Sequence, residues 1–147
     1  MDDDLHFLAK DPRNREPHIF FTSQESNVQG VGMMYRVLDK EGFIRKLDHN
    51  FNGVSLNVRF NVVDSFLPSN HGSLVVHFEG GKPVLGGSGY DVEVSLNVEW
   101  FSSLVMCVAD FKKLWVYGLV EVSDESYVDT LDKLFHVARK PETIEEF

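Results

Sequence analysis

Hydrophobic and polar positions alternate along several stretches of the chain, and the clearest case is residues 54–62. Every second residue there is Val, Leu or Phe, and the residues between them are Ser, Asn or Arg. A period of two is typical of a strand with one buried face. Similar patterns predict five to six strands, at residues 32–37, 54–62, 74–78, 83–85, 91–96 and 119–122.

The apolar residues recur at helical spacing in four other stretches. Asp39 and Asn97 are placed to be N-caps of the first two, and Ser123 opens the last. Gly118 and Pro141 are residues that interrupt a helix and would end the third and the fourth. The pattern predicts helices at residues 40–47, 98–108, 111–117 and 123–139.

The order of these elements predicts the fold class. Most strands follow one another through short turns, and residues 79–82 carry a strong hairpin signal. A largely antiparallel sheet of five to six strands is therefore expected, with the helices covering one face in an α+β arrangement. Residues 1–29 are polar and rich in turn-forming residues, so we expect a linker or N-terminal arm there and one domain at 30–147.

Composition narrows the classes of function. A chain of 147 residues with 43% hydrophobic content can bury a real core, and its formal net charge of −9 argues against nucleic acid or an anionic membrane surface as a partner. The one cysteine, Cys107, excludes an intrachain disulfide and favours a reducing compartment. With no signal peptide and no long apolar run, a cytoplasmic protein without a membrane span is expected.

Motifs for catalysis or cofactor binding are not found in the pattern. The six histidines lack metal-ligand spacing, so no metal site is expected. The glycines at 86, 87 and 89 lack the lysine and the following helix of a phosphate loop, and no serine stands in a nucleophile elbow. Cys107 lies on an apolar stripe, which favours a buried structural thiol over a nucleophile.

An apolar cavity between the sheet and the helices is the remaining candidate site. Methionines such as Met33 and Met106 are adaptable side chains that suit such a cavity, and the alternative is that they only fill the core. The side chains expected to line it are Met33, Trp100, Phe101, Leu104, Val105 and Trp115.

A family resemblance is carried by residues spread over roughly 30–147. They are Met34, Tyr35, Arg36, Val37 and Asp39; Asp64 with Pro68, Asn70 and Gly72; the alternating strand that leads into Trp100 and Phe101; Tyr117 and Gly118; and Leu134, Phe135, Pro141 and Phe147. In this pattern the chain resembles the C-terminal, sterol-carrier-protein-2-like (SCP2-like) domain of Eis-type (enhanced intracellular survival) N-acetyltransferases of the GNAT superfamily. The shared residues describe a fold and contain no active-site signature.

The resemblance implies a role for the end of the chain. In that family, GNAT domains of the same polypeptide carry acetyl-CoA, and the terminal carboxylate reaches the active site beside an acidic pocket that holds the amine substrate. It implies that the α-carboxylate of Phe147 is the catalytic base, with Glu146 and Asp64 as candidates for the acidic pocket. With a pKa near 3.3–3.7 a terminal carboxylate is ionised at neutral pH. The alternative is that Phe147 is only an apolar anchor.

The chain also departs from the family. It has no GNAT portion, and residues 29–32 do not form the acetyl-CoA pyrophosphate loop, so no cofactor is expected in this chain and no acetyl transfer by it alone. Three hypotheses follow. They are an accessory domain of an N-acetyltransferase, a stand-alone carrier of a lipid or other hydrophobic ligand, and a structural domain that mediates assembly, for example as a homo-oligomer.

Overall fold

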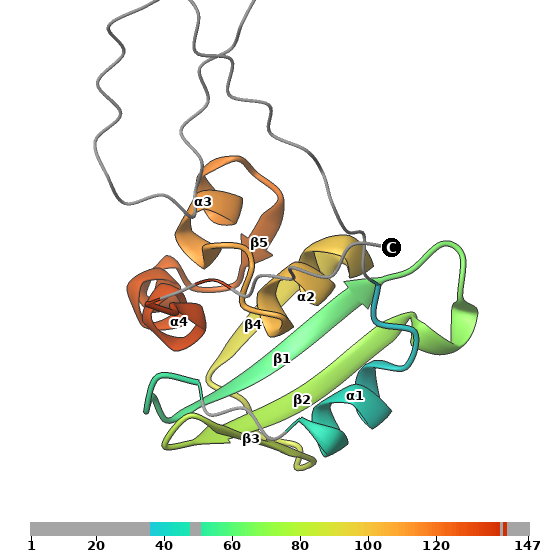
Figure 1. The fold of residues 1–147 in the computed structure, drawn as a ribbon, viewed down its shortest axis with the longest axis horizontal. Coiled ribbons are helices and arrows are strands. Elements are labelled where there is room, and N and C mark those ends of the chain that lie inside the picture. The colour runs from blue at the N-terminus through green and yellow to red at the C-terminus, as the bar shows by residue number, and fades with distance from the viewer. Residues whose placement is uncertain (1–35, 48–50, 139, 141–147) are drawn as a thin grey trace, which may run out of the picture. The chain divides into compact units, whose positions relative to one another are not determined.

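The computed structural model describes residues 36–47, 51–138 and 140, and a five-stranded sheet is its central element. The strands lie in the order β3-β2-β1-β4-β5, so β1 is the middle strand (Figure 1). They are β1 (Leu56–Val63), β2 (Gly72–Glu79), β3 (Lys82–Leu85), β4 (Val92–Asn97) and β5 (Val120–Val122).

The sheet is mostly antiparallel, as the sequence predicts. Three of its four strand pairs are antiparallel, and the pair β1–β4 is parallel, with Val58 opposite Val92. The parallel pair is not visible in the hydrophobic pattern. It arises because the β2–β3 hairpin occupies one edge of β1, so the chain crosses back through residues 86–91 and adds β4 at the other edge.

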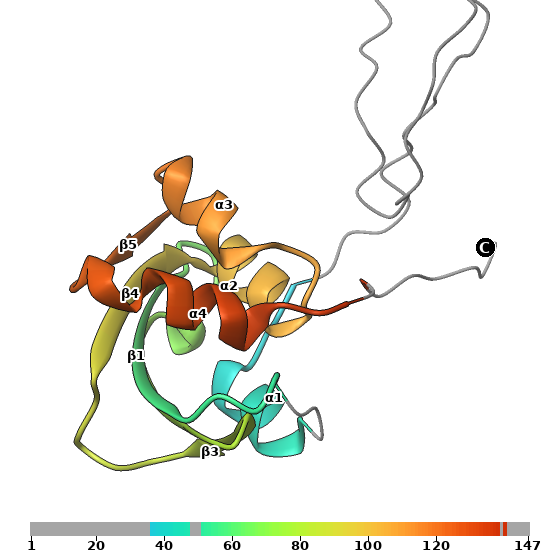
Figure 2. The same ribbon diagram turned by 90° about the vertical axis from the view of Figure 1, so that its left-hand side faces the viewer.

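The helices cover one face of the sheet, which confirms the predicted α+β arrangement. Figure 2 shows the sheet curving around α2 and α4, with α1 on the same side. The elements are α1 (Lys40–Lys46), α2 (Val98–Val105), α3 (Phe111–Val116) and α4 (Val128–Phe135), with short 3₁₀ turns η1 (Pro68–Asn70) and η2 (Glu125–Tyr127).

The first two helix caps differ in how they work. The predicted N-cap Asp39 is confirmed, because its carboxylate accepts a hydrogen bond of 2.9 Å from the Gly42 amide. Asn97 occupies the N-cap position of α2, but its side chain makes no capping hydrogen bond. The amide group of Asn97 donates instead to a Glu99 carboxylate oxygen at 3.1 Å.

The last helix begins later than predicted. Ser123 was expected to begin it, but its hydroxyl accepts from the backbone amide of Glu93 at 2.9 Å and joins β5 to β4. Asp124 is the cap of the η2 turn, accepting from the Ser126 amide at 2.9 Å, and α4 follows that turn. Aspartate caps a helix at least as well as serine, so Asp124 instead of Ser123 is the N-cap residue.

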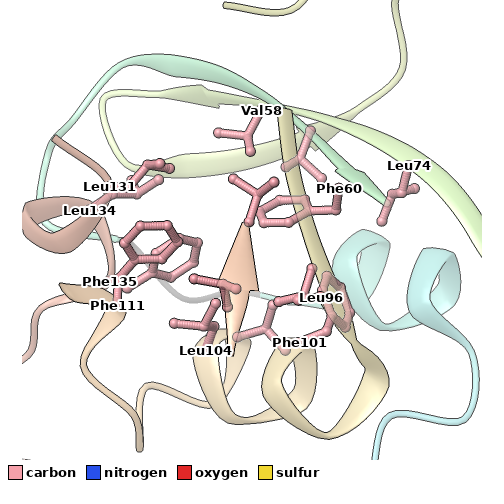
Figure 3. Packing of buried hydrophobic residues seen from close by; sticks show 14 of the residues in the cluster. Val58, Phe60, Leu74, Leu96, Phe101, Leu104, Phe111, Leu131, Leu134 and Phe135 are labelled. Carbon is pink, nitrogen blue, oxygen red and sulfur yellow. The ribbon is translucent and has the colours of Figure 1, made fainter. Parts of the chain in front are cut away.

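Phenylalanine rings make up the centre of the core. Phe135, on α4, meets Phe51, Phe60 and Phe78 edge-on at centroid distances of 5.6, 6.3 and 6.0 Å. Its ring stacks on Phe111 of α3 at 6.1 Å. Figure 3 shows the rings of Phe60, Phe111 and Phe135 between the sheet and the helices, together with leucines of α2 and α4. The rings therefore join the sheet to both of the last two helices.

Part of the predicted architecture lies outside the described residues. The boundary between 29 and 30 falls there, as do residues 32–35 of the first predicted strand. Arg36 and Val37, the last two residues of that strand, are described and are not part of a strand.

Candidate functional site

An apolar groove of about 460 Å³ lies where α1, the segment before it and the end of α2 meet. One face of α1 lines it, since its contributing residues recur three and four positions apart. Leu38 and Met106 supply exposed apolar atoms at its rim. The complete lining is Arg36, Val37, Leu38, Asp39, Gly42, Phe43, Lys46, Leu47 and Met106.

Asp64 lies beside this groove, just after β1, and its carboxylate is enclosed by donors. One oxygen accepts from the amides of Phe66 at 2.9 Å and Leu67 at 2.8 Å, and pairs with the Arg36 guanidinium at 2.5 Å. The other oxygen accepts from the side-chain amide of Asn70 at 3.1 Å. The Asp64 side chain has no exposed surface, so it presents no free oxygen to solvent.

This environment keeps Asp64 ionised. Desolvation by burial raises its pKa, but the hydrogen bonds from Leu67, Asn70 and Phe66, together with the charge of Arg36, have the larger effect. The result is a pKa lowered to about 2. The ionised Asp64 carboxylate forms an ion pair with Arg36, whose side chain remains 37% exposed. The guanidinium carbon of Arg36 lies over the Phe66 ring, 5.6 Å from the ring centroid.

Three of the residues predicted to line a cavity belong to the packed core. Phe101, Leu104 and Val105 are buried on α2, and Phe101 meets the ring of Phe60 edge-on at 5.5 Å (Figure 3). They lie on the face of α2 that is turned toward the sheet. The groove meets α2 at its C-cap residue, Met106.

The two tryptophans are half-buried and lie apart from the apolar groove. Trp100 lines a second, more polar groove of about 290 Å³ together with Val63 of β1 and Glu121 of β5. Trp115 packs on the outside of the core from α3. The structure therefore does not bring the five described residues of the predicted cavity lining together around one space.

Other predicted site residues lie outside the described part of the chain. Met33 precedes residue 36, and Glu146 and Phe147 follow residue 140. Their roles stay predictions.

Cys107 is a buried thiol in a left-handed turn at the end of α2, with φ of 58°. Desolvation raises its pKa to about 11, so the reactive thiolate is scarce at neutral pH. No cluster of three metal-ligating side chains occurs within residues 36–47, 51–138 and 140. Over the same residues, no helix is long and apolar enough to cross a membrane.

The groove itself was missed by the prediction of a cavity under the sheet. Its signal was present in Phe43 of α1 and in Leu47, the C-cap residue of that helix, which lie four positions apart and are only partly buried. Met106 is one of the adaptable residues considered at the start, and the structure places it in the groove wall.

The combination of a curved five-stranded sheet and helices on its inner side defines an α+β domain of the sterol-carrier type. A family model described as sterol carrier protein domain matches residues 40–143, and the chain belongs to this family. A search of curated proteins gave no match.

Solved structures with a similar fold include two acetyltransferases. A GCN5-related N-acetyltransferase from Kribbella flavida aligns with a TM-score of 0.58 and 21% identity over 71% of this chain and 26% of that one. Eis1 from Mycobacterium abscessus aligns with a TM-score of 0.57 and 20% identity over 74% of this chain and 26% of that one. A probable N-acyltransferase from Enterococcus faecalis has a TM-score of 0.55 at 16% identity, with 67% and 25% covered. The chain thus spans about a quarter of the length of these structures.

Proposed function

We propose that this chain is the accessory SCP2-like domain of an Eis-type, GNAT-superfamily N-acetyltransferase. The observation that carries the proposal is the likeness in fold to proteins named as N-acetyltransferases, of which this chain matches only about a quarter. In this proposal the remaining domains bind acetyl-CoA, and the domain described above shapes the pocket for the amine substrate.

The proposed chemistry uses the end of the chain. The α-carboxylate of Phe147 binds the ammonium group of the substrate and accepts one of its protons. The neutral amine then attacks the acetyl carbonyl carbon of acetyl-CoA, the amide forms as the C–S bond breaks, and coenzyme A leaves as a thiol after taking the second proton from the nitrogen. Glu146 adds negative charge to the same pocket. Asp64 contributes indirectly, since its carboxylate is already engaged and fixes the exposed guanidinium of Arg36.

Deleting Phe147 tests this proposal in a polypeptide that joins the chain to acetyl-CoA-binding domains. The shortened chain ends in the α-carboxylate of Glu146, one residue short of the original position. We therefore expect acetyl transfer to fall by about two orders of magnitude, the usual loss when a general base is removed from its place, while the unfolding midpoint stays the same. Phe147→Ala is the matched control because it keeps a carboxylate at the same position and removes only the ring. Undiminished turnover after the deletion would refute the catalytic role, and loss in both variants would assign Phe147 to anchoring.

A second candidate function is the carriage of a lipid or other hydrophobic ligand. The apolar groove beside α1 favours it, because exposed Leu38 and Met106 leave part of its wall open to solvent. Leu47→Asp should weaken the binding of a fluorescent fatty acyl probe by at least about tenfold, because a carboxylate in an apolar site is poorly solvated. Val84→Asp, at an exposed position of β3 outside the groove, is the control. Equal probe binding by all three proteins would argue against the groove as a carrier site.

A further inference from the structure

Residues 36–40 form a segment that we call the joint, which leads the described chain into α1. Its first four residues belong to neither a strand nor a helix, and Lys40 is the first residue of α1. A segment of this kind has no ladder of backbone hydrogen bonds to hold it, so side chains elsewhere must do so if it is to be ordered.

The backbone of the joint is held by two buried polar side chains. The Ser102 hydroxyl, on α2, accepts from the Val37 amide at 3.0 Å and donates to the Val98 carbonyl at 2.7 Å. The Asn70 side chain, in η1, donates to the Val37 carbonyl at 2.9 Å and accepts from the Lys40 amide at 2.9 Å. Asn70 thus binds the joint at two points, three residues apart.

The charged side chains of the joint reach back to the same loop. The Lys40 ammonium donates to the carbonyls of Asn70 and His71 at 2.8 and 3.2 Å. The Arg36 guanidinium pairs with Asp64, which in turn accepts from the Asn70 side chain. Each end of the joint therefore carries a cation that is fixed to residues 64–71.

The buried polar side chains of the described residues are concentrated in this arrangement. Within the described residues, four polar or charged residues are buried, and all four take part in it: Lys40, Asp64, Asn70 and Ser102. Burying a polar group is unfavourable unless it is hydrogen-bonded, and satisfied buried networks make one conformation specific. Here the network fixes the conformation of the five consecutive residues of the joint.

We propose that the joint is a rigid positioning device. Asn70 and Ser102 hold residues 37–40 in one conformation, which fixes the backbone that leads into α1. The same contacts fix the wall of the apolar groove that Val37 and Leu38 supply. The groove is therefore preformed, and a ligand or a packed side chain that enters it does not have to order this wall.

Backbone ¹⁵N relaxation of the full chain tests the proposal without reference to any ligand or enzyme activity. In the unchanged protein we expect order parameters of about 0.85 for the amides of Val37, Leu38 and Lys40, equal to those of β1. Asn70→Ala should lower them below about 0.6 while β1 keeps its values. Because the order parameter is measured in the folded state, a change in global stability does not mimic this result.

Asn61→Ala is the matched control. Asn61 bonds Ser73 and Ser95 on the uncovered face of the sheet, at 2.7 and 3.3 Å, and its loss should leave the joint unchanged. Should Asn70→Ala fail to fold, Ser102→Ala removes the acceptor of Val37 and should loosen that amide alone. Order parameters below 0.6 in the unchanged protein, or unaltered values in the folded variant, would overturn the proposal.

Discussion

The turn between β2 and β3 contains two adjacent glycines, which allow the cost of a positive φ to be separated from the cost of a steric contact. Gly80 and Gly81 both have positive φ, at 59° and 88°. A Cβ added at Gly80 would meet no atom within 4 Å. A Cβ added at Gly81 would lie 1.9 Å from the carbonyl oxygen of Phe51 and 2.7 Å from the amide nitrogen of Gly53. Alanine at either position measures the cost of the positive φ. Alanine at position 81 also measures the cost of the close contact with the backbone of Phe51 and Gly53.

The expected losses follow from this geometry. A left-handed conformation costs an alanine about 1–2 kcal/mol, which is the whole expected effect of Gly80→Ala. Gly81→Ala must also displace the backbone of residues 51–53. Two hydrogen bonds join this backbone to Gly81, one from the Phe51 amide to the Gly81 carbonyl at 2.7 Å and one from the Gly81 amide to the Val54 carbonyl at 2.8 Å. At about 1 kcal/mol each, their loss brings the total to about 3–4 kcal/mol before any disturbance of the Phe51 ring.

Urea unfolding followed by circular dichroism measures both losses. With a slope of about 2 kcal/mol per molar urea, the midpoints of the two variants should differ by about 1 M. Similar slopes for all three proteins would show that the transitions can be compared. Equal midpoints for the two variants would refute the argument that the Phe51 carbonyl prevents a side chain at position 81.

Two other predictions concern the core and the pH dependence of stability. Phe135→Ala removes a ring that contacts four other phenylalanines and should reduce the free energy of unfolding by about 3–5 kcal/mol. Phe66→Ala, at a position 76% exposed, removes only the contact with Arg36 and should reduce the free energy of unfolding by about 0.5–1 kcal/mol. Comparable losses for the two variants in denaturant titrations would contradict this prediction. The pKa of Asp64 in the folded chain, about 2, lies below the unfolded value of about 3.9, so its stabilisation is fully present above about pH 4 and is lost as the pH falls toward 2. Asp64→Asn should flatten the stability curve over that interval, and thermal midpoints between pH 2 and 6 that keep the original slope would count against it.

The hydrophobic pattern was sufficient to predict most elements and the faces they bury. Alternation in β1 identified Leu56, Val58, Phe60 and Val62 as the inward set, and all four are buried. It did not predict that β4 runs parallel to β1, because the pattern gives the buried face of a strand but not its neighbour. The shift of the last cap to Asp124 was missed because serine and aspartate stand side by side and both are good caps.

The site was less predictable than the fold. Asp64 and Asn70 could be recognised as members of a family pattern, yet their contacts with Arg36 and Lys40 join residues about 30 positions apart. Such contacts depend on how η1 sits against the chain before α1, and no local spacing encodes that. The groove had only a weak signal, since Phe43 and Leu47 are apolar residues of a short helix and usually indicate core.

The parallel pairing of β1 with β4 also determines the order in which the chain can fold. During synthesis β1, β2 and β3 are complete by Leu85, and these antiparallel neighbours can pair at once. The other edge of β1 stays open until Val92 and the residues after it have been made, since Val58 pairs with Val92. In that interval a central strand with Val58 and Phe60 on its apolar face presents unpaired backbone groups, the arrangement from which edge-to-edge aggregation begins. Until β4 emerges, this edge of β1 is open to misassociation, and β4 closes the edge as well as completing the sheet.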